Sequence, residues 1–454
     1  MTSKKISEKI NKMTNENSNK KPNHLLSPMT CPHGLADVDL FSPGAQEHWY
    51  EAYDILHKEA PMHRIPGEGF KPGTDAFIVT RHDDIAAIVR DQDRFPLPGS
   101  LFVRQIVESG TDPFEQEHVN VMMASMATLR PNPELWRTHR QELTDPWIGP
   151  GATRHKDMVT RVANELIDQF IERRSVEWVS EFAKPLPQIV MANVLGWPLE
   201  DLPKLKQFGD ACVQPFVFGS GHRNQLQRDE VKAQFAVLDE FESFSAELIR
   251  QKRAHPEDDM ISALTQVRYS PLDRTLTDPE INGIVYAMVI GGLETTQYAL
   301  AEQVQLLIDH DDIWSSIKSE TSKIRSFTEE AMRLRSPTQG LSTRITSQDE
   351  VFQGVTVAKG SFLHLRWAAA NIDPNEWDEP KTLKLDRKAG TRHLTFSQGA
   401  RVCPGATLSR LEQTVAWDVI TQRIAKFNYS ANNNFLHQPG IMLGTLELNL
   451  EFTH

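Results

Sequence analysis

A cysteine between two glycines, directly before a predicted helix, is the feature of this sequence best suited to chemistry. The segment Phe396-Ser-Gln-Gly-Ala-Arg-Val-Cys-Pro-Gly-Ala406 places Cys403 between Gly399 and Gly405. Glycine adopts backbone angles closed to other residues and lets the main chain come close to a flat ligand. The first turn of a helix offers unpaired N–H groups that can hydrogen-bond a thiolate. We therefore expect Cys403 to be a thiolate ligand for the metal of a flat cofactor, although a lone cysteine is more often a small buried apolar residue.

Two further segments combine charged or hydroxyl side chains in unusual helical positions. Gly291-Gly-Leu-Glu-Thr-Thr296 lies inside a helix that is predicted to begin near Pro279. Two glycines and two threonines are poor helix formers, so they indicate a local opening of the helix. The alternative is a glycine-rich packing face with a hydrogen-bonded threonine.

The second segment is Glu330-Ala-Met-Arg333, which is followed by Pro337. Its two charges are neighbours on a helix because they are three residues apart. Taken alone, this pair is typical of a solvated surface ion pair that contributes less than about 1 kcal/mol.

Helices and a small amount of strand must position these residues. Residues 47–58 and 83–91 are predicted helices around a strand at 76–80, and helical periodicity dominates from about 134 to 335. Residues 355–365 alternate apolar and polar around Lys359-Gly360, which predicts a hairpin. A long loop, 371–402, then leads to an amphipathic helix beside Cys403, on which Leu408, Leu411, Val415 and Val419 recur.

Composition limits the class of protein. The 454 residues carry a net charge of −12 and include only three, widely spaced cysteines, Cys31, Cys212 and Cys403. Negative charge disfavours general binding to nucleic acid or anionic membrane, and the cysteines favour a reducing, cytoplasmic compartment. No apolar run is long enough to span a bilayer. Residues 1–30 are expected to form a flexible arm and 31–454 a single domain, because no linker or repeat divides the chain.

The cysteine segment matches the haem loop of cytochrome P450 enzymes, Phe-x-x-Gly-x-[Arg/His]-x-Cys-x-Gly. All five positions are present, and Ser397 stands where members often carry Gly. They are Phe396, Gly399, Arg401, Cys403 and Gly405. The chain therefore resembles the soluble bacterial members of that superfamily. The resemblance runs from about residue 35 to the end, and implies haem b as the cofactor with Cys403 as its iron ligand.

The resemblance also implies a fold and a set of roles. It implies a mainly α fold with a small β region, and haem between the Glu294 helix and the Cys403 helix. Glu294 and Thr295 fall on the acid and alcohol pair that delivers protons to the reacting oxygen. The Glu330–Arg333 pair is then buried, tied to an arginine or another polar group in the loop before the cysteine.

Arginines are expected to anchor the haem propionates, because a guanidinium pairs well with a carboxylate. The candidates are Trp136-x-x-x-Arg140, Arg344 and Arg401. Each arginine taken alone could be a surface residue, and this alternative is strongest for Arg140.

A basic segment suggests the electron donor. Seven basic residues lie between 381 and 410 against one acidic residue, Asp386. They are Lys381, Lys384, Arg387, Lys388, Arg392, Arg401 and Arg410. Their charge predicts a rim that steers an acidic ferredoxin, itself reduced by an NAD(P)H-dependent ferredoxin reductase. An ordinary solvated basic loop is the alternative.

The expected activity is monooxygenation of a small molecule. The chain resembles the 6-O-methyl-D-galactose O-demethylases of marine polysaccharide-degrading bacteria, which implies release of galactose and formaldehyde. A terpene, fatty-acid or aromatic hydroxylase is the alternative within the family. A non-catalytic haem sensor or carrier would have no use for Glu294 and Thr295, and a cysteine hydrolase would need a histidine beside Cys403. A peroxide-driven enzyme would carry Arg and Pro instead of the acid and alcohol.

Overall fold

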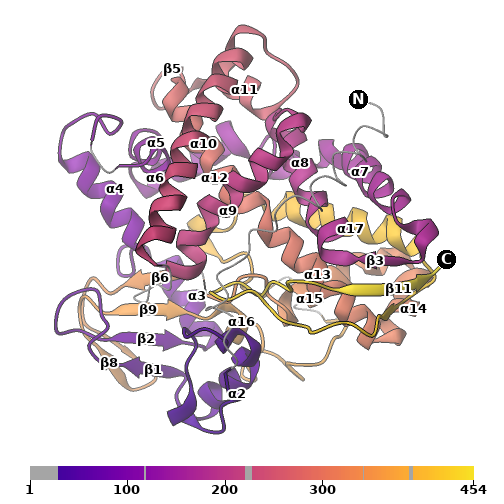
Figure 1. The fold of residues 1–454 in the computed structure, drawn as a ribbon. Coiled ribbons are helices and arrows are strands. Elements are labelled where there is room, and N and C mark those ends of the chain that lie inside the picture. The colour runs from indigo at the N-terminus through magenta and orange to yellow at the C-terminus, as the bar shows by residue number, and fades with distance from the viewer. Residues whose placement is uncertain (1–28, 117–118, 220–226, 341, 388–391) are drawn as a thin grey trace.

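The computed structural model describes residues 29–454, apart from 117–118, 220–226, 341 and 388–391 (Figure 1). Helices fill most of the molecule, while the main sheet lies at one lower corner beside α2 (Figure 1). This confirms the predicted mainly α fold with a small β region. The predicted arm lies outside the described residues except at its last two positions, and the single domain stays a prediction. Among the described residues, no helix has the length and apolar character that a bilayer crossing requires.

Four helices carry the segments singled out in the sequence. They are α12 (Asp278–Gly292), α13 (Glu294–Asp309), α15 (Ile324–Leu334) and α17 (Ala406–Arg423). The other α-helices among the described residues are α2 (Trp49–Glu59), α3 (His82–Arg90), α4 (Pro98–Glu108), α5 (Val121–Leu129), α6 (Pro133–His139), α7 (Lys156–Asp168), α8 (Pro185–Leu195), α9 (Leu202–Gly219), α10 (Arg228–Ala254), α11 (Met260–Gln266), α14 (Asp311–Ser319) and α16 (Trp367–Ala370).

The largest sheet has four strands in the order β1-β2-β9-β6. These are Met62–Ile65, Ala76–Val79, Phe362–Leu365 and Ser342–Ile345. The β2 and β9 strands are parallel, and the outer pairs are antiparallel. A second sheet joins β10 (Lys426–Tyr429), β11 (Asn449–Thr453) and β3 (Ser175–Glu177). Two short pairs, β4 (Arg268–Tyr269) with β5 (Arg274–Thr275) and β7 (Glu350–Phe352) with β8 (Val355–Val357), complete the strands.

The predicted hairpin around Lys359-Gly360 is wrong. The β8 strand pairs backward with β7, across a turn at Gln353 and Gly354, both of which have positive φ. The β9 strand pairs with β2 and β6 instead. Gly360 has a φ of 90° and turns the chain from one sheet to the other. Alternation of apolar residues indicates strand but does not choose the partner, which depends on distant parts of the chain.

The helix α12 is fixed at its start and along its length. Thr277 caps its N-terminus, and Pro279 lies in the first turn, where its missing N–H costs nothing. Gly283 lets α5 approach closely, because a Cβ there would lie 2.3 Å from the Cβ of Ser125. The Ser125 hydroxyl also donates to the Glu280 carbonyl at 2.8 Å. These contacts hold α5 and α12 together as neighbouring walls of the cavity described below.

Candidate functional site

The cysteine loop is a tight structure held by its own backbone. The Cys403 N–H donates to the Phe396 carbonyl at 2.8 Å, and the Ser397 N–H donates to the Leu394 carbonyl at 2.8 Å. Gly399 has a φ of 73°, which agrees with the expectation of a special backbone angle there. Gly405 has an ordinary φ of −83°, so that expectation is wrong for it. A Cβ at Gly405 would meet nothing within 4 Å, which keeps this side of the loop open to a flat ligand.

Ser397 stands where members of the family often carry Gly, and its φ is positive, at 59°. A left-handed backbone costs a residue with a Cβ about 1–2 kcal/mol. We expect Ser397→Gly to raise the free energy of unfolding by about 0.5 kcal/mol, since the gain outweighs the greater unfolded-state entropy of glycine. Thermal denaturation followed by circular dichroism measures the change.

Ser315→Gly is the matched control, because Ser315 is exposed within α14. Glycine in a helix should lower the free energy of unfolding by about 0.5 kcal/mol. If both variants lower the melting temperature equally, the backbone of Ser397 is not strained.

The Cys403 side chain is partly buried, three residues before the start of α17. Burial raises its pKa most strongly, while the N–H groups of Gly405 and Ala406 and the charges of Arg140 and Arg410 lower it; the net direction is upward. The chain therefore supplies donors for a thiolate but does not ionise the thiol alone. A metal cation bound to Cys403 would supply the remaining stabilisation, because a coordinating thiol is deprotonated.

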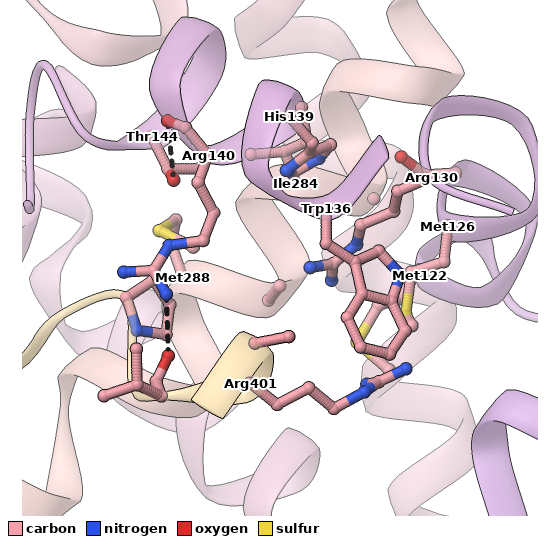
Figure 2. A pocket seen from close by; sticks show the side chains of 16 residues that line it. Met122, Met126, Arg130, Trp136, His139, Arg140, Thr144, Ile284, Met288 and Arg401 are labelled. Carbon is pink, nitrogen blue, oxygen red and sulfur yellow. Dashed lines mark hydrogen bonds between the residues drawn. The ribbon is translucent and has the colours of Figure 1, made fainter. Parts of the chain in front are cut away.

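A cavity of about 220 Å³ lies between α5, α6, α12 and the cysteine loop. It is lined by apolar side chains, including Met122, Met126, Ile284 and Met288, and by three arginines (Figure 2). The arginines are Arg130, Arg140 and Arg401. Its walls therefore combine an apolar surface with concentrated positive charge.

The arginines near the cavity have lowered pKa values. Burial and the charges of Arg130 and Arg344 lower the pKa of Arg401 to about 9. Burial lowers the pKa of Arg344 to about 10, and burial together with Arg140 brings the pKa of Arg130 to about 10. In the described part of the chain, no carboxylate pairs with Arg130 or Arg401, and the Nε atom of each lacks a hydrogen-bond partner. A flat apolar group with two carboxylates fits these walls, and haem b is such a group.

Two predicted anchors contact protein groups as well. The Arg401 guanidinium lies 3.7 Å from the centroid of the Trp136 ring (Figure 2). It also donates to the Ser100 hydroxyl at 2.6 Å. The Arg140 guanidinium donates to the Val402 carbonyl at 2.9 Å, which ties α6 to the cysteine loop. Trp136, Arg140 and Arg401 thus meet in one cavity, and the charge of Arg344 acts on Arg401.

Arg130 is a cavity residue that the sequence analysis missed. It follows the last residue of α5, between an apolar helix and Pro131. Its position as a lone arginine at the end of an apolar helix is a pattern that could have indicated a role for Arg130. His139 lines the same cavity, and burial followed by the charges of Arg130 and Arg140 holds its pKa well below the usual range.

The helix opening predicted at Gly291–Thr296 is present. The helix breaks at Leu293, between α12 and α13. The Thr295 hydroxyl donates to the Gly291 carbonyl at 3.1 Å, and the Tyr298 hydroxyl donates to Glu294 Oε2 at 2.6 Å. Thr296 instead lies 2.9 Å from the Ser409 hydroxyl on α17, so it joins the two helices. Glu294 and Thr295 are therefore adjacent groups at the break.

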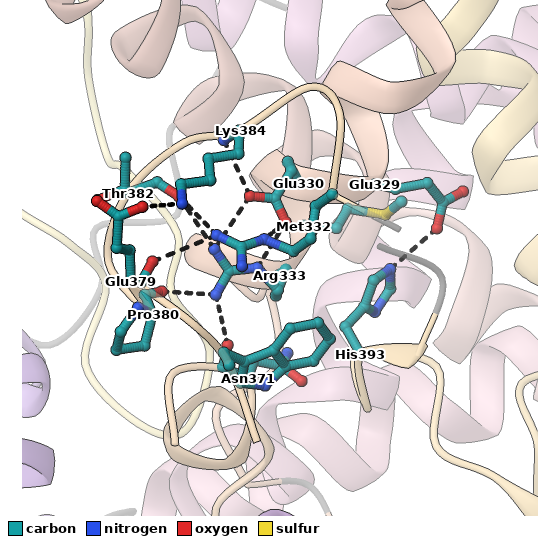
Figure 3. Close-up of polar contacts among 12 residues, drawn as sticks. Glu329, Glu330, Met332, Arg333, Asn371, Glu379, Pro380, Thr382, Lys384 and His393 are labelled. Atoms are coloured by element: carbon teal, nitrogen blue, oxygen red, sulfur yellow. Dashed lines mark hydrogen bonds and ion pairs between the residues drawn. The ribbon is translucent and has the colours of Figure 1, made fainter. Parts of the chain in front are cut away.

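The Glu330–Arg333 pair is buried, not on the surface. Its side chains are 2% and 0% exposed, and Arg333 Nε donates to Glu330 Oε1 at 2.6 Å (Figure 3). Arg387, from the loop before the cysteine, donates to the same oxygen at 2.9 Å. Arg333 also donates to the carbonyls of Asn371 and Pro380. The predicted tie between this helix and the loop is thus formed by Arg387.

A second buried carboxylate, which the sequence analysis did not single out, holds the cysteine loop. Glu329 accepts hydrogen bonds from Arg410 at 2.6 and 2.9 Å and lies 3.0 Å from His393 Nε2. Burial acts to raise its pKa, but the hydrogen bonds and charges of His393 and Arg410 outweigh this and lower it to about 2. Arg410 in turn lies 4.4 Å from the centroid of the Phe396 ring.

The lowered pKa of Glu329 predicts that the protein loses stability at acidic pH. Because the folded pKa lies below the ordinary 4.5, the stabilisation is present above about pH 4.5 and is lost as the pH falls toward 2. This lowering of the Glu329 pKa corresponds to a contribution of about 3 kcal/mol to the free energy of unfolding. We expect Glu329→Gln to reduce stability at pH 7 and to flatten the fall between pH 4.5 and 2, measured as urea midpoints. If the urea midpoint of the variant falls between pH 4.5 and 2 as steeply as that of the original protein, this role of Glu329 is wrong.

The basic segment is largely neutralised, which corrects the expected positive rim. Lys381 pairs with Asp54, Lys384 with Glu379, and Arg392 with Glu376. Arg387 and Arg410 bind the buried glutamates, and Arg401 lies in the cavity. Lys388 lies outside the described residues. The counterions come from distant parts of the chain, so a count along the segment could not include them.

Comparisons with known proteins agree with this geometry. A family model described as Cytochrome P450 matches residues 99–452. The biotin biosynthesis cytochrome P450 of Bacillus subtilis is 30% identical over 384 residues, covering 84% of this chain and 90% of that relative. The polyketide biosynthesis cytochrome P450 PksS of the same organism is 26% identical, covering 85% and 91%.

Solved structures show the same fold. P450BioI in complex with hexadec-9Z-enoic acid ligated acyl carrier protein has a TM-score of 0.75 at 26% identity, covering 90% of this chain and 99% of that one. CalO2 has a TM-score of 0.77 at 18% identity, covering 92% and 98%. The family match spans the cavity, the helix break and the cysteine loop, and the chain therefore belongs to the cytochrome P450 family, whose cofactor is haem b.

Proposed function

We propose that this cytochrome P450 is an oxidative O-demethylase of a methylated sugar such as 6-O-methyl-D-galactose. One oxygen atom of O₂ replaces a methyl C–H bond by C–OH, and two electrons and two protons reduce the other atom to water. The resulting hemiacetal breaks at its C–O bond, its hydroxyl proton passes to the sugar oxygen, and galactose and formaldehyde leave. Haem b, when bound, supplies the activation of O₂.

The residues around the cavity have separate roles in this proposal. Cys403 is the iron ligand, with Gly405 and Ala406 donating N–H groups to its sulfur. Arg130, Arg344 and Arg401 bind the propionates, which is supported by their burial without a carboxylate partner for Arg130 or Arg401. Phe396 and Gly399 shape the loop, while Trp136 holds Arg401 and Arg140 holds the Val402 carbonyl.

A polar group in an apolar cluster supports a small oxygenated substrate. Tyr298, which donates to Glu294, packs in a cluster with Val213, Ile441 and Met442. Thr338 forms a β-bridge to Met442, is 6% exposed, and its hydroxyl has no hydrogen-bond partner among the described residues. A buried hydroxyl without a partner costs free energy, which a sugar hydroxyl can recover. This is the observation that carries the choice of a sugar over an alkane-like substrate.

The substrate is tested by a formaldehyde assay. Methylated galactose should give formaldehyde and galactose in equal amounts, and its binding should shift the haem spin state. A fatty acid and a terpene form the comparison arms, since one structural relative carries an acyl chain in its complex. Turnover of either without formaldehyde from the sugar rejects the O-demethylase. Ligand binding with no oxygen consumption in any arm would instead identify a sensor or carrier.

Glu294 and Thr295 deliver protons in this proposal. Tyr298 remains protonated, since burial and then the charge of Glu294 raise its pKa well above the usual range, and it orients the carboxylate. Thr295→Ala should lower formaldehyde formed per NAD(P)H by about tenfold and raise hydrogen peroxide release, as removal of a positioned proton donor costs at least that much. Product, peroxide and NAD(P)H are measured together. Thr296→Ala is the matched control, and equal uncoupling in both variants would contradict the assignment.

The electron donor is proposed to be a separate ferredoxin with an NAD(P)H-dependent reductase. Arg90 and Arg137 are exposed on α3 and α6, the helices that contact residues 399–401 of the cysteine loop. Their exposed positive charge supports docking of an acidic protein there. Turnover should fall with ionic strength, and Arg137→Glu should raise the KM for ferredoxin. A rate insensitive to salt would reject this docking site.

A further inference from the structure

Three potential metal ligands meet at the start of α3, away from the cavity. His82 and Asp83 begin the helix, and Glu376 comes from the loop after α16. His82 Nδ1 lies 3.6 Å from Asp83 Oδ1 and 3.9 Å from Glu376 Oε2. One ligand atom of each residue lies within 4.8 Å of the others. His82 is 4% exposed, whereas the Asp83 side chain is 95% exposed, so one side of the cluster is open to solvent.

The buried imidazole directs a lone pair into this cluster. His82 Nε2 lies 3.3 Å from the Arg392 carbonyl, which can only accept, so Nε2 carries the proton. This leaves Nδ1 available to a metal, and Nδ1 has no hydrogen-bond partner among the residues that the structure describes. Three potential electron-pair donors therefore face one another, an arrangement that a divalent cation bound between them would stabilise.

We propose that His82, Asp83 and Glu376 form a divalent-cation site that prefers Zn²⁺. One imidazole nitrogen and two carboxylate oxygens suit zinc, and solvent on the Asp83 side supplies the remaining ligand. In tetrahedral zinc sites the ligand atoms lie about 3.3 Å apart, so the two distances from His82 Nδ1 must close by about 0.3 and 0.6 Å, and the two carboxylate oxygens by at most about 1.5 Å. The exposed Asp83 side chain is free to make that movement.

The surroundings support binding rather than oppose it. The Arg392 carbonyl orients the ring as the outer partner of a ligating histidine commonly does. The Arg392 side chain pairs with Glu376 through Oε1, which leaves Oε2 for the metal. Arg81, the nearest other cation in the sequence, is already paired with Asp373 at 2.7 Å. Oε2 of Glu376 and the exposed Asp83 carboxylate thus remain for the metal.

A bound cation would join three separate segments. It would link the start of α3, the loop after α16, and, through the Arg392 carbonyl, the chain next to His393. His393 contacts Glu329, which holds Arg410 below the cysteine loop. The site therefore stabilises the approach to the cysteine loop without touching the reacting groups.

The test uses the haem-loaded full-length protein after dialysis against a chelator. Isothermal titration with Zn²⁺ should show one site per chain, together with a rise in melting temperature. Asp83→Asn should weaken Zn²⁺ binding by more than about tenfold, since loss of even an outer partner costs that much. The change lies on an exposed side chain, so folding is retained. His82→Gln should have the same effect on binding.

Asp84→Asn is the matched control, because Asp84 is the next carboxylate on α3 but bonds to Gln353. The Asp84→Asn variant should bind Zn²⁺ with the affinity of the original protein. Mg²⁺ should bind neither the original protein nor any variant at this site, because Mg²⁺ prefers oxygen ligands. Absence of stoichiometric Zn²⁺ binding overturns the proposal. Equal Zn²⁺ affinity in the Asp83 and Asp84 variants also overturns it, by placing the metal elsewhere.

Discussion

Glu330→Gln is expected to lower the free energy of unfolding by about 3–5 kcal/mol, the cost of removing one partner from a buried ion pair. Glu330 accepts from both Arg333 and Arg387, and its neutral amide would leave two buried guanidinium groups facing each other. Such a loss is a large part of the total stability of a domain, which is about 5–15 kcal/mol. Thermal and urea unfolding followed by circular dichroism should both show it.

A surface pair with the same spacing provides the control. Glu320 and Lys323 lie three residues apart at 3.1 Å, but their side chains are largely exposed. Glu320→Gln should leave the melting temperature unchanged, since solvent screens an exposed pair. If Glu330→Gln does not accumulate as folded protein, Arg387→Gln gives a milder test, because the Glu330–Arg333 pair remains. Equal melting temperatures for the Glu320 and Glu330 variants would refute the buried role.

Cys403→Ser is expected to abolish the thiolate spectrum of the haem protein and its monooxygenation. A serine hydroxyl ionises far less readily than a thiol, so the N–H donors of Gly405 and Ala406 would face a neutral ligand. The carbon monoxide difference spectrum of the reduced protein should lose the band characteristic of thiolate ligation, and formaldehyde formation should fall below detection. Haem content is measured separately, so that loss of ligation is distinguished from loss of haem.

The other cysteines supply matched controls. Cys31→Ser should leave both the spectrum and the activity unchanged, because Cys31 is a free cysteine far from Cys403 in the sequence. Cys212 is buried, and burial raises its pKa to about 12, so it is not a ready source of thiolate. An unaltered spectrum in Cys403→Ser would show that another residue binds the iron, and the proposed function would fail with it.

Several features could be predicted from the local sequence pattern alone. The loop around Cys403 was identified from five fixed positions, because each glycine, aromatic and basic residue there serves the same short stretch of backbone. The break at Leu293 was predicted from helix-poor residues, since a cluster of glycine and threonine weakens a helix wherever it lies. The helix beside Cys403 followed from apolar periodicity, which reports the buried face directly.

Other features depended on partners far along the chain. The same E-x-x-R spacing fits an exposed or a buried pair, and contacts with remote residues decide which, among them Arg387, 57 residues from Glu330. The segment 381–410 looked positive until Asp54, Glu376 and Glu379 were seen to pair with it. The false hairpin arose because β9 pairs with β2, which lies far earlier in the sequence.

The sequence by itself determined the family, the mainly α fold and the identity of the cysteine loop, because these depend on residue type and on spacing within one element. Only the tertiary structure decided that Arg130 joins Arg401 in one cavity, that Glu329 anchors Arg410, and that His82 faces two carboxylates. Burial and charge pairing depend on distances between remote segments, and one-dimensional spacing does not contain those distances.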